Sequence, residues 1–342
     1  MRRDLVERIV AATLYEGYIL YPYRPSSVKN QLRWTFGGVH PRGWSEASGG
    51  VEPWQAVTET LLEGDDRASI EAEVRCLHVV TRTTGRATGT DREFVAAPSV
   101  SIGGRIHRSW EEAEERVVGC GTHSLAALLA GGVRVAINVP ERTWDETLGE
   151  DGGATTVVRR RHTALHGEVT LSARRVDPQH TRVRVAVANL TDAAADLDRD
   201  AALRHSMVST HLLLGADGAR WLSLADPPAG LGAAARDCVN AGLWPVLVGE
   251  DDDTVLASPI ILEDHPQVAP ESPGDLFDAT EIDEILSLRI LTLGDDEKSE
   301  MRAADERSRA LLDRTEALTA EDFLRMHGVI RGSAAGTTAR RG

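Results

Sequence analysis

Residues 167–190, GEVTLSARRVDPQHTRVRVAVANL, carry the clearest indication of the fold in this chain. Apolar and polar residues alternate on both sides of Asp177-Pro178-Gln179-His180, and such alternation is typical of strands with one buried face. An Asp-Pro pair between two alternating runs marks a turn. The stretch therefore predicts an antiparallel hairpin of two strands joined by a short connection.

Similar signals extend outward from this hairpin. Residues 71–80 and 133–139 alternate as strands, the former with one face expected to be wet. Asp217-Gly218 and the acidic residues 251–253 each lie between apolar runs and predict two more hairpins. We therefore expect a central antiparallel β portion over residues 70–262, sandwich-like in architecture.

Helical patterns are found towards the two ends of the chain. After Asp4, apolar residues recur at helical spacing, and residues 53–65 form another amphipathic segment. Residues 295–318 indicate a strongly charged helix. The predicted fold class is α+β with helical segments at both termini. Its parts are an aromatic-rich helical segment at 1–69, the β domain at 70–262, an acidic loop and C-terminal helices at 263–330, and a disordered tail at 331–342.

Charge and composition narrow the function classes. Among 342 residues, 53 are acidic and 38 basic, which gives a formal charge of -15 and argues against nucleic acid as a partner. No apolar run is long enough to span a bilayer, so we expect a cytoplasmic protein. Only Lys29 and Lys298 are lysines, a bias typical of GC-rich genomes, so arginine clusters are discounted here as signs of anion recognition.

Aromatic residues gather near the N-terminus. All four tyrosines lie in residues 15–23, and tryptophans follow soon after. Such side chains dominate binding interfaces. One interpretation is a partner-binding face, with these anchors and rim residues: Tyr18, Tyr21, Tyr23, Arg24, Arg33 and Trp34. The alternative is that the tyrosines close an edge of the core, although Pro22 and Pro25 favour an exposed connection.

Two Cys-His pairs suggest a metal site. Cys76 and His78 share one face of a predicted strand, and Cys120 and His123 lie in a glycine-flanked stretch. Thiolate and imidazole ligands are typical of tetrahedral zinc. This alternative requires the two pairs to converge; otherwise they are buried thiols and satisfied histidines. The sequence contains no GxSxG elbow, P-loop or GxGxxG motif that would indicate a particular enzyme class.

Two stretches carry a family resemblance. Residues 14–39, with LYEGY, YPYR and RWTFGGV, and residues 258–275, SPIILEDHPQVAPESPGD, resemble a bacterial family associated with gene clusters of actinobacterial-type nickel–iron hydrogenases. The similarity runs from the first helix to about residue 318. It implies a role in the assembly, maturation or support of a larger metalloenzyme, and it transfers no catalytic residue.

These observations favour a non-catalytic accessory or assembly protein that acts through protein–protein contacts. The resemblance implies hydrogenase subunits or maturation factors as partners; self-association stays open. No cofactor is expected. One alternative is a metal-binding protein or metal-dependent enzyme that uses zinc or another transition metal. A module that holds a small molecule in a β-sandwich cleft is a third.

Overall fold

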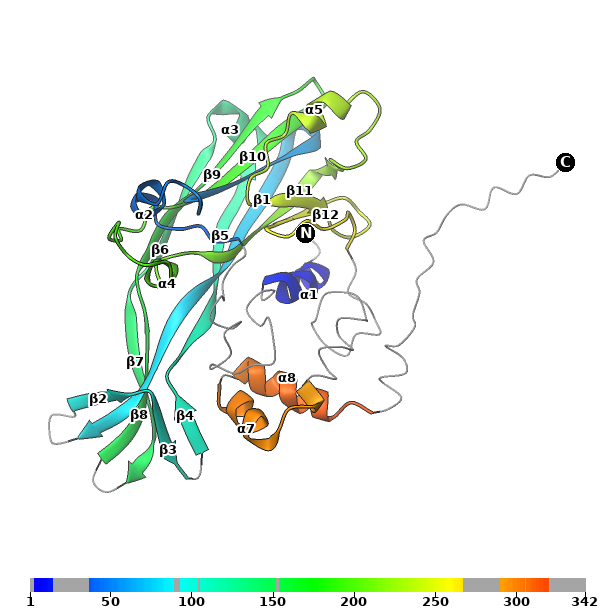
Figure 1. Cartoon of the computed structure of the whole chain (residues 1–342). Helices are drawn as coiled ribbons and strands as arrows, with labels where there is room; N and C mark the ends of the chain where they lie inside the picture. Colours follow the sequence, from blue (N-terminus) through cyan, green and yellow to red (C-terminus); the bar gives the residue numbers. More distant parts are fainter. Residues whose placement is uncertain are drawn as a thin grey trace.

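A computed structural model describes residues 3–14, 37–88, 93–103, 105–151, 154–266, 290–304 and 306–319. One antiparallel sheet of 11 strands dominates this part of the chain, and β3 and β4 form a separate pair (Figure 1). The strands are β1 (Gln55–Thr88), β2 (Glu93–Ala97), β3 (Ser99–Ile102), β4 (Arg105–Arg108), β5 (Trp110–Ser124), β6 (Val133–Val139), β7 (Arg142–Asp151), β8 (Ala154–His162), β9 (Leu165–Arg175), β10 (His180–Asn189), β11 (Val208–Leu222), β12 (Trp244–Leu247) and β13 (Thr254–Ser258). The helices are α1 (Arg3–Leu14), α2 (Arg42–Ala47), α3 (Leu125–Ala130), α4 (Arg199–Leu203), α5 (Gly232–Arg236), α7 (Asp295–Ala304) and α8 (Glu306–Glu316).

Strand β1 is the spine of the sheet. It runs for 34 residues and bonds in turn to five other strands (Figure 1). Its partners are β10 along residues 55–63, β11 along 61–77, β5 along 69–82, β8 along 81–87 and β2 along 84–88. The predicted antiparallel β-rich character is therefore confirmed, in the form of one continuous sheet.

The start of β1 corrects one expectation. Because β1 begins at Gln55, residues 55–69 are strand and not part of a helical segment that ends at residue 69. The sequence Gly64-Asp65-Asp66 resembles the end of a helix or strand. In the structure it lies at an irregularity in the pairing of β1 with β11. The β1–β11 register shifts between Gly64 and Ser69, and the strand continues beyond it.

Two of the three expected hairpins form. Strands β9 and β10 pair from Gly167 with Asn189 to Arg175 with Thr181. In the turn, Asp177 Oδ1 accepts hydrogen bonds from the backbone N–H groups of Gln179 at 2.8 Å and His180 at 2.9 Å. This Asx-type turn explains why the Asp-Pro signal was informative. Strands β12 and β13 form the other hairpin.

The prediction of a third hairpin around Asp217-Gly218 is wrong. Residues 208–222 form the single strand β11, and Asp217-Gly218 lies within it. Gly218 has a φ of 72°, which a glycine adopts without a steric penalty. The same irregularity in the β1–β11 ladder involves this glycine, because Asp217 pairs with Ser69 and Ala219 with Gly64. The glycine therefore serves a bulge instead of a chain reversal.

The two faces of β1 contribute to two different cores. Val74 and Cys76 belong to the larger core, which also contains side chains from β5, β9, β10, β11 and α3. Leu77 and Val79 belong to a second core, which α1 covers. The face of residues 71–80 that was expected to be wet is therefore partly buried, and its polar side chains need partners.

Helices α7 and α8 pack against each other towards the C-terminal end of the described residues. Ile290, Met301, Leu311 and Leu312 are buried between them. Figure 1 shows these helices on the same side of β1 as α1. The helix expected over residues 295–318 is thus two helices, and the tail expected at 331–342 lies outside the described residues. No helix in the described ranges is long and apolar enough to cross a membrane.

Candidate functional site

The six side chains of the expected partner-binding face lie outside the described residues. They are Tyr18, Tyr21, Tyr23, Arg24, Arg33 and Trp34. The structure does describe both flanks of residues 15–36, which we call the aromatic segment. One flank is α1, which ends at Leu14, and the other begins at Gly37.

Helix α1 is fixed to the sheet by apolar packing. Val6, Ile9, Val10 and Leu14 recur at helical spacing, and each has no exposed surface. They pack on the second core with Leu77 and other residues of the sheet. Burying four such side chains stabilises the docked helix by roughly 1.5–3 kcal/mol each, before entropy is counted.

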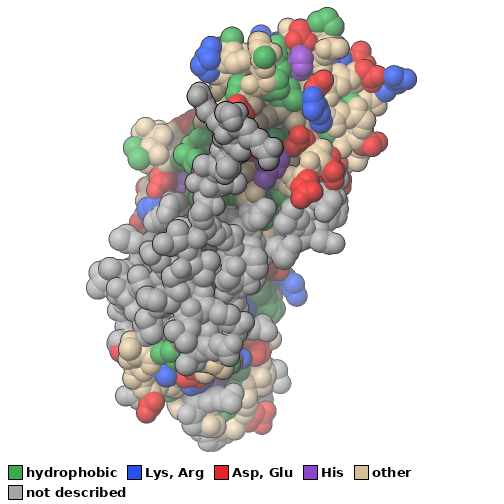
Figure 2. Space-filling model, turned by 90° about the vertical axis from the view of Figure 1, so that its right-hand side faces the viewer, with side chains coloured by type: hydrophobic (Ala, Val, Ile, Leu, Met, Phe, Trp, Pro, Cys, Tyr) green, Lys and Arg blue, Asp and Glu red, His purple; other side chains and the backbone are tan. Residues whose placement is uncertain are grey.

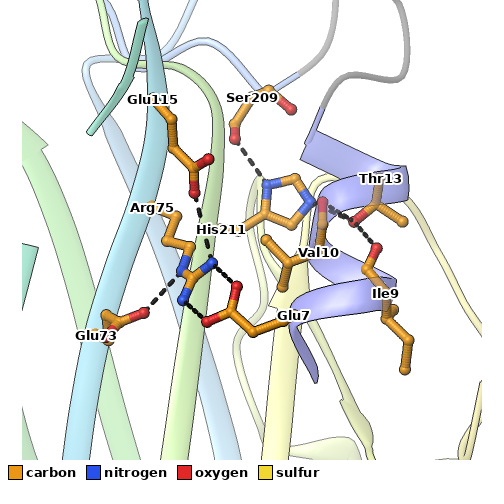
Figure 3. Close-up of polar contacts among 9 residues, drawn as sticks. All are labelled: Glu7, Ile9, Val10, Thr13, Glu73, Arg75, Glu115, Ser209 and His211. Atoms are coloured by element: carbon orange, nitrogen blue, oxygen red, sulfur yellow. Dashed lines mark hydrogen bonds and ion pairs between the residues drawn. The ribbon is translucent and has the colours of Figure 1, made fainter. Parts of the chain in front are cut away.

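A buried arginine adds a polar clamp to this packing (Figure 3). Arg75, on the face of β1 that α1 covers, is 7% exposed. Its terminal nitrogens donate to both carboxylate oxygens of Glu7 in α1, at 2.6 and 2.5 Å, and its Nε donates to Glu73 at 2.7 Å. Glu115 of β5 lies 3.5 Å away. The Glu7 carboxylate raises the pKa of Arg75 above its ordinary value, so the guanidinium stays charged.

A buried histidine completes the attachment of α1 (Figure 3). The Nδ1 of His211 lies 2.7 Å from the carbonyl oxygen of Ser209, and its Nε2 lies 3.0 Å from the hydroxyl of Thr13 in α1. A carbonyl only accepts, so Nδ1 carries the proton of the neutral ring. The hydroxyl of Thr13 has a single proton and lies 3.0 Å both from Nε2 and from the carbonyl oxygen of Ile9, so these two acceptors share it. Burial lowers the pKa of His211 to about 4, so this neutral form dominates at neutral pH.

The second flank of the aromatic segment meets the same part of the sheet. The N–H of Thr210 donates to the carbonyl of Gly37 at 3.0 Å. Gly37 has a φ of 58°, and a Cβ atom there would lie 2.5 Å from the Cβ of Pro259. Only glycine fits this position. Two residues further on, the carbonyl of Val39 accepts from the side-chain amide of Asn189 at 2.8 Å.

The two flanks of the aromatic segment are therefore bonded to consecutive residues of β11, Thr13 to His211 and Gly37 to Thr210. Sequence reasoning missed both Arg75 and His211. The sequence signal that could have indicated Arg75 is the pair of opposite charges at Glu73 and Arg75, two residues apart in β1. We expected both side chains to face solvent. A buried pair of this kind needs a covering element, and α1 provides it.

The start of the acidic loop has a structural role. Asp264 accepts a hydrogen bond from the N–H of Leu247 at 2.8 Å and one from the hydroxyl of Ser223 at 2.5 Å. The carboxylate thus holds the chain after β13 against β12 and the end of β11. The structure describes this acidic loop only as far as Pro266.

The two Cys-His pairs do not converge. In the β1–β5 ladder His78 faces Glu114, whereas His123 faces Ile70, eight positions along β1. At about 3.3 Å per residue, this separation is roughly 26 Å. Cys76 faces Arg116, four residues from Cys120 along β5, which is roughly 13 Å. A single tetrahedral site from Cys76, His78, Cys120 and His123 is therefore incompatible with the register. Among the described residues, no group of three or more His, Cys, Asp or Glu could hold a metal.

Each member of the pairs has another environment. Cys76 and Cys120 are buried in the larger core. The ring of His78 packs against that of His162, with centroids 4.8 Å apart, and the Nε of Arg116 lies 3.4 Å from its Nδ1. The Nε2 of His123 lies 2.8 Å from the carbonyl oxygen of Cys120. These contacts match the alternative of buried thiols, and they give each histidine a protein contact, although the buried Nε2 of His78 has no hydrogen-bond partner among the described residues.

Thiol chemistry gives a direct check of this arrangement. Burial raises the pKa of Cys76 to about 12 and the pKa values of Cys120 and Cys238 to about 11. The thiolate is the reactive form, so at about pH 8 the native thiols should react with Ellman's reagent at least about 100-fold more slowly than in urea. Fast reaction of Cys120 in the native protein, judged by its loss in Cys120→Ser, would contradict the buried assignment.

One further cluster has the composition of a catalytic triad. The Ser206 hydroxyl lies 3.0 Å from Nδ1 of His40, and Nε2 of His40 lies 3.1 Å from a carboxylate oxygen of Glu52. However, Ser206 is fully buried and its hydroxyl donates to the carbonyl of Ala202 at 2.8 Å. Arg199 holds Glu52 from the other side at 2.7 Å. The cluster therefore joins the segment around α2 to α4, and its serine is not available to a substrate.

Charged side chains in the described residues are mixed in sign. On the face shown in Figure 2, both basic and acidic groups are visible at each end of the molecule. Comparison of the chain with family models, with curated proteins and with solved structures gives no match. The function is therefore argued from the site and from the sequence.

Proposed function

We propose that the protein is a non-catalytic accessory or assembly protein that binds other proteins through its aromatic segment. The observation that supports this most is the attachment of both flanks of the segment to consecutive residues of β11, Thr210 and His211. The two ends of the segment are thus held at one place on the sheet. Binding residues are commonly carried by segments that a rigid scaffold positions in this way.

The composition of the segment supports the same proposal. Tyrosine, tryptophan and arginine are the residue types that dominate binding energy at interfaces, and residues 15–36 contain all three. The clamp at Arg75 and the buried His211 hold α1, and therefore the first flank, against the sheet at neutral pH. Such a fixed attachment lowers the entropy that binding would otherwise cost.

For the partner, we propose a subunit or maturation factor of a nickel–iron hydrogenase. The support is the resemblance carried by residues 14–39 and 258–275. Gly37 and Pro259 come from these two stretches, and they are packed in direct contact. The two stretches are therefore in contact at Gly37 and Pro259, as expected of segments that contribute to the same surface.

The test is affinity capture with the hydrogenase subunits and maturation factors encoded in the host. The wild type is compared with Tyr21→Ala/Tyr23→Ala/Trp34→Ala and with Trp144→Ala, an aromatic control in β7 far along the chain. We expect the wild type and the control to capture a hydrogenase protein. The triple variant should lose at least about tenfold in affinity, since hot-spot truncations cost more than about 1 kcal/mol each.

Two results would count against the proposal. Capture of the same partner by the triple variant at wild-type affinity would exclude the aromatic segment as the docking surface. Absence of every hydrogenase protein from the wild-type eluate would exclude the proposed partner class. Urea unfolding of each variant verifies that a loss of capture does not reflect a loss of fold.

A further inference from the structure

A hollow of about 250 Å³ opens on the sheet beyond the core that α1 covers. Its lining residues come from β1, from β8 and from the positions that directly follow β8 and α4. They are Val79, Thr81, Thr83, Arg159, Arg161, Thr163 and Arg204. The floor follows alternate residues of β1. After Leu77 and Val79, which are apolar and buried, the same face continues with Thr81 and Thr83.

The walls of the hollow are arginine side chains. Arg161 pairs with Thr81 and Arg159 with Thr83 in the β1–β8 ladder, so both share the face of the floor. Arg204 follows α4 and reaches Glu111 of β5, the register partner of Thr81 on the other edge of β1, at 2.7 Å. Its side chain therefore crosses β1 beside the threonines. Thr163 fixes this wall, because its hydroxyl donates to the backbone carbonyl of Arg204.

Each arginine is held in place by one carboxylate. Arg159 donates through Nε and one terminal nitrogen to both oxygens of Asp145, each at 2.8 Å. Arg161 and Arg204 use only Nε, which donates to Glu141 at 2.9 Å and to Glu111 at 2.7 Å. The carboxylates thus orient the guanidinium groups and leave the terminal nitrogens of Arg161 and Arg204 as donors.

Several donors at the hollow lack an acceptor among the described residues. They are the terminal nitrogens of Arg161 and Arg204 and the hydroxyls of Thr81 and Thr83. A neighbouring group reports their electrostatic effect: the pKa of His205 is lowered by burial first, and then by the positive charges of Arg161 and Arg204. Glu141 opposes this lowering of the pKa of His205, but its effect is smaller than that of either arginine.

We propose that this hollow is a binding site for a small organic anion with a carboxylate or phosphate head and a compact apolar body. The head would accept from the terminal nitrogens of Arg161 and Arg204, whose planar forks suit such groups. The body would lie on the methyl groups of Val79, Thr81 and Thr83. At about 30 Å³ for each water in the liquid, the hollow has room for roughly eight water-sized groups. This site is independent of the aromatic segment.

The experiment uses the full chain and three probes. Benzoate has a carboxylate head and an apolar ring, phenyl phosphate has the same ring with a phosphate, and benzamide has the shape of benzoate without the charge. Calorimetry and ligand-observed NMR should show that at least one anion binds and that benzamide binds at least about tenfold more weakly. The better anion identifies the head group.

Matched variants locate the binding. Arg161→Met and Arg204→Met should each weaken the better anion by about tenfold or more, which is about 1.4 kcal/mol. Arg220→Met is the control, because Arg220 is 58% exposed and paired to Glu63, much as Arg161 is 57% exposed and paired to Glu141. Thr81→Val/Thr83→Val keeps the shape of the floor and the methyl groups on which the body lies, so it should weaken binding less than the two arginine variants.

Three results would overturn the proposal. One is that neither anion binds the wild type at concentrations up to about 10 mM. A binding free energy of only about 4 kcal/mol, which is a Kd of about 1 mM, would be detected at that concentration. Another is equal loss of binding in Arg220→Met and in the hollow variants. The last is equal affinity for benzoate and benzamide, since the arginines would then make no contribution through charge.

Discussion

Replacing Arg75 by methionine is expected to lower the free energy of unfolding by about 3–5 kcal/mol, the range found when one partner of a buried ion pair is removed. Arg75 is 7% exposed and Glu73 is 9% exposed, so the variant removes the positive charge that lies against a buried carboxylate. Glu7 would lose its two hydrogen bonds to Arg75 as well. Urea unfolding measures the change, and limited proteolysis near α1 shows whether the helix detaches first.

Two comparisons separate the charge effect from simple loss of contact. Arg67→Met removes an arginine that is 91% exposed and paired to Asp65, and it should change stability by less than about 0.5 kcal/mol. Adding Glu73→Gln to Arg75→Met removes the buried negative charge that Arg75 had neutralised and should restore part of the loss. Equal stability of Arg75→Met and the wild type would show that α1 is held by its apolar face alone.

Acidification from neutral pH to about pH 5 is expected to cost the protein about 4 kcal/mol through two buried histidines. Burial lowers the pKa of His211 to about 4 and that of His78 to about 3, against an ordinary value of 6.5. The unfolded chain binds protons below pH 6.5 and the folded chain does not, so stability falls as the pH drops below that value. At about 1.4 kcal/mol per pH unit, each histidine accounts for about 2 kcal/mol.

Urea unfolding between about pH 7 and pH 5 tests this pH dependence. The double variant His78→Asn/His211→Asn should be less stable at neutral pH but should lose much less on acidification. His166→Asn, at an exposed histidine, serves as the control and should follow the wild-type curve. Parallel curves for the double variant and the wild type would exclude these two side chains as the cause. Because His211 also holds Thr13, the same acidification should loosen α1.

The sequence contained enough local information for the hairpins of β9–β10 and β12–β13, because each turn is specified by neighbouring residues such as Asp177. It did not contain enough for the long strands. Gly64-Asp65-Asp66 and Asp217-Gly218 are both turn signals when viewed separately. In the sheet they lie opposite each other at one irregularity between β1 and β11, and this pairing decides that neither chain reverses. Such information is non-local and is absent from any short window.

The candidate sites show the same limit. Arg75 and His211 were missed because the element that covers them, α1, is far from both in sequence. The arginines of the hollow were set aside because the composition explained them, and only the strand register shows that Arg159 and Arg161 share a face with Thr81 and Thr83. The aromatic segment was found from composition, while its attachment to Thr210 and His211 required the structure.

The long spine strand has a consequence for synthesis on the ribosome. The partners of β1 emerge in the order β2, β5, β8, β10 and β11, so its last ladder cannot close until residue 222 has left the exit tunnel. Until then Leu61 and Ile70, both fully buried in the finished protein, belong to a strand with an open edge. At about 5–20 residues per second, the interval between completing β1 and β11 is roughly 7–27 s. Slower translation lengthens this interval, so we expect the nascent chain to need a chaperone over the open edge more than its final stability would suggest.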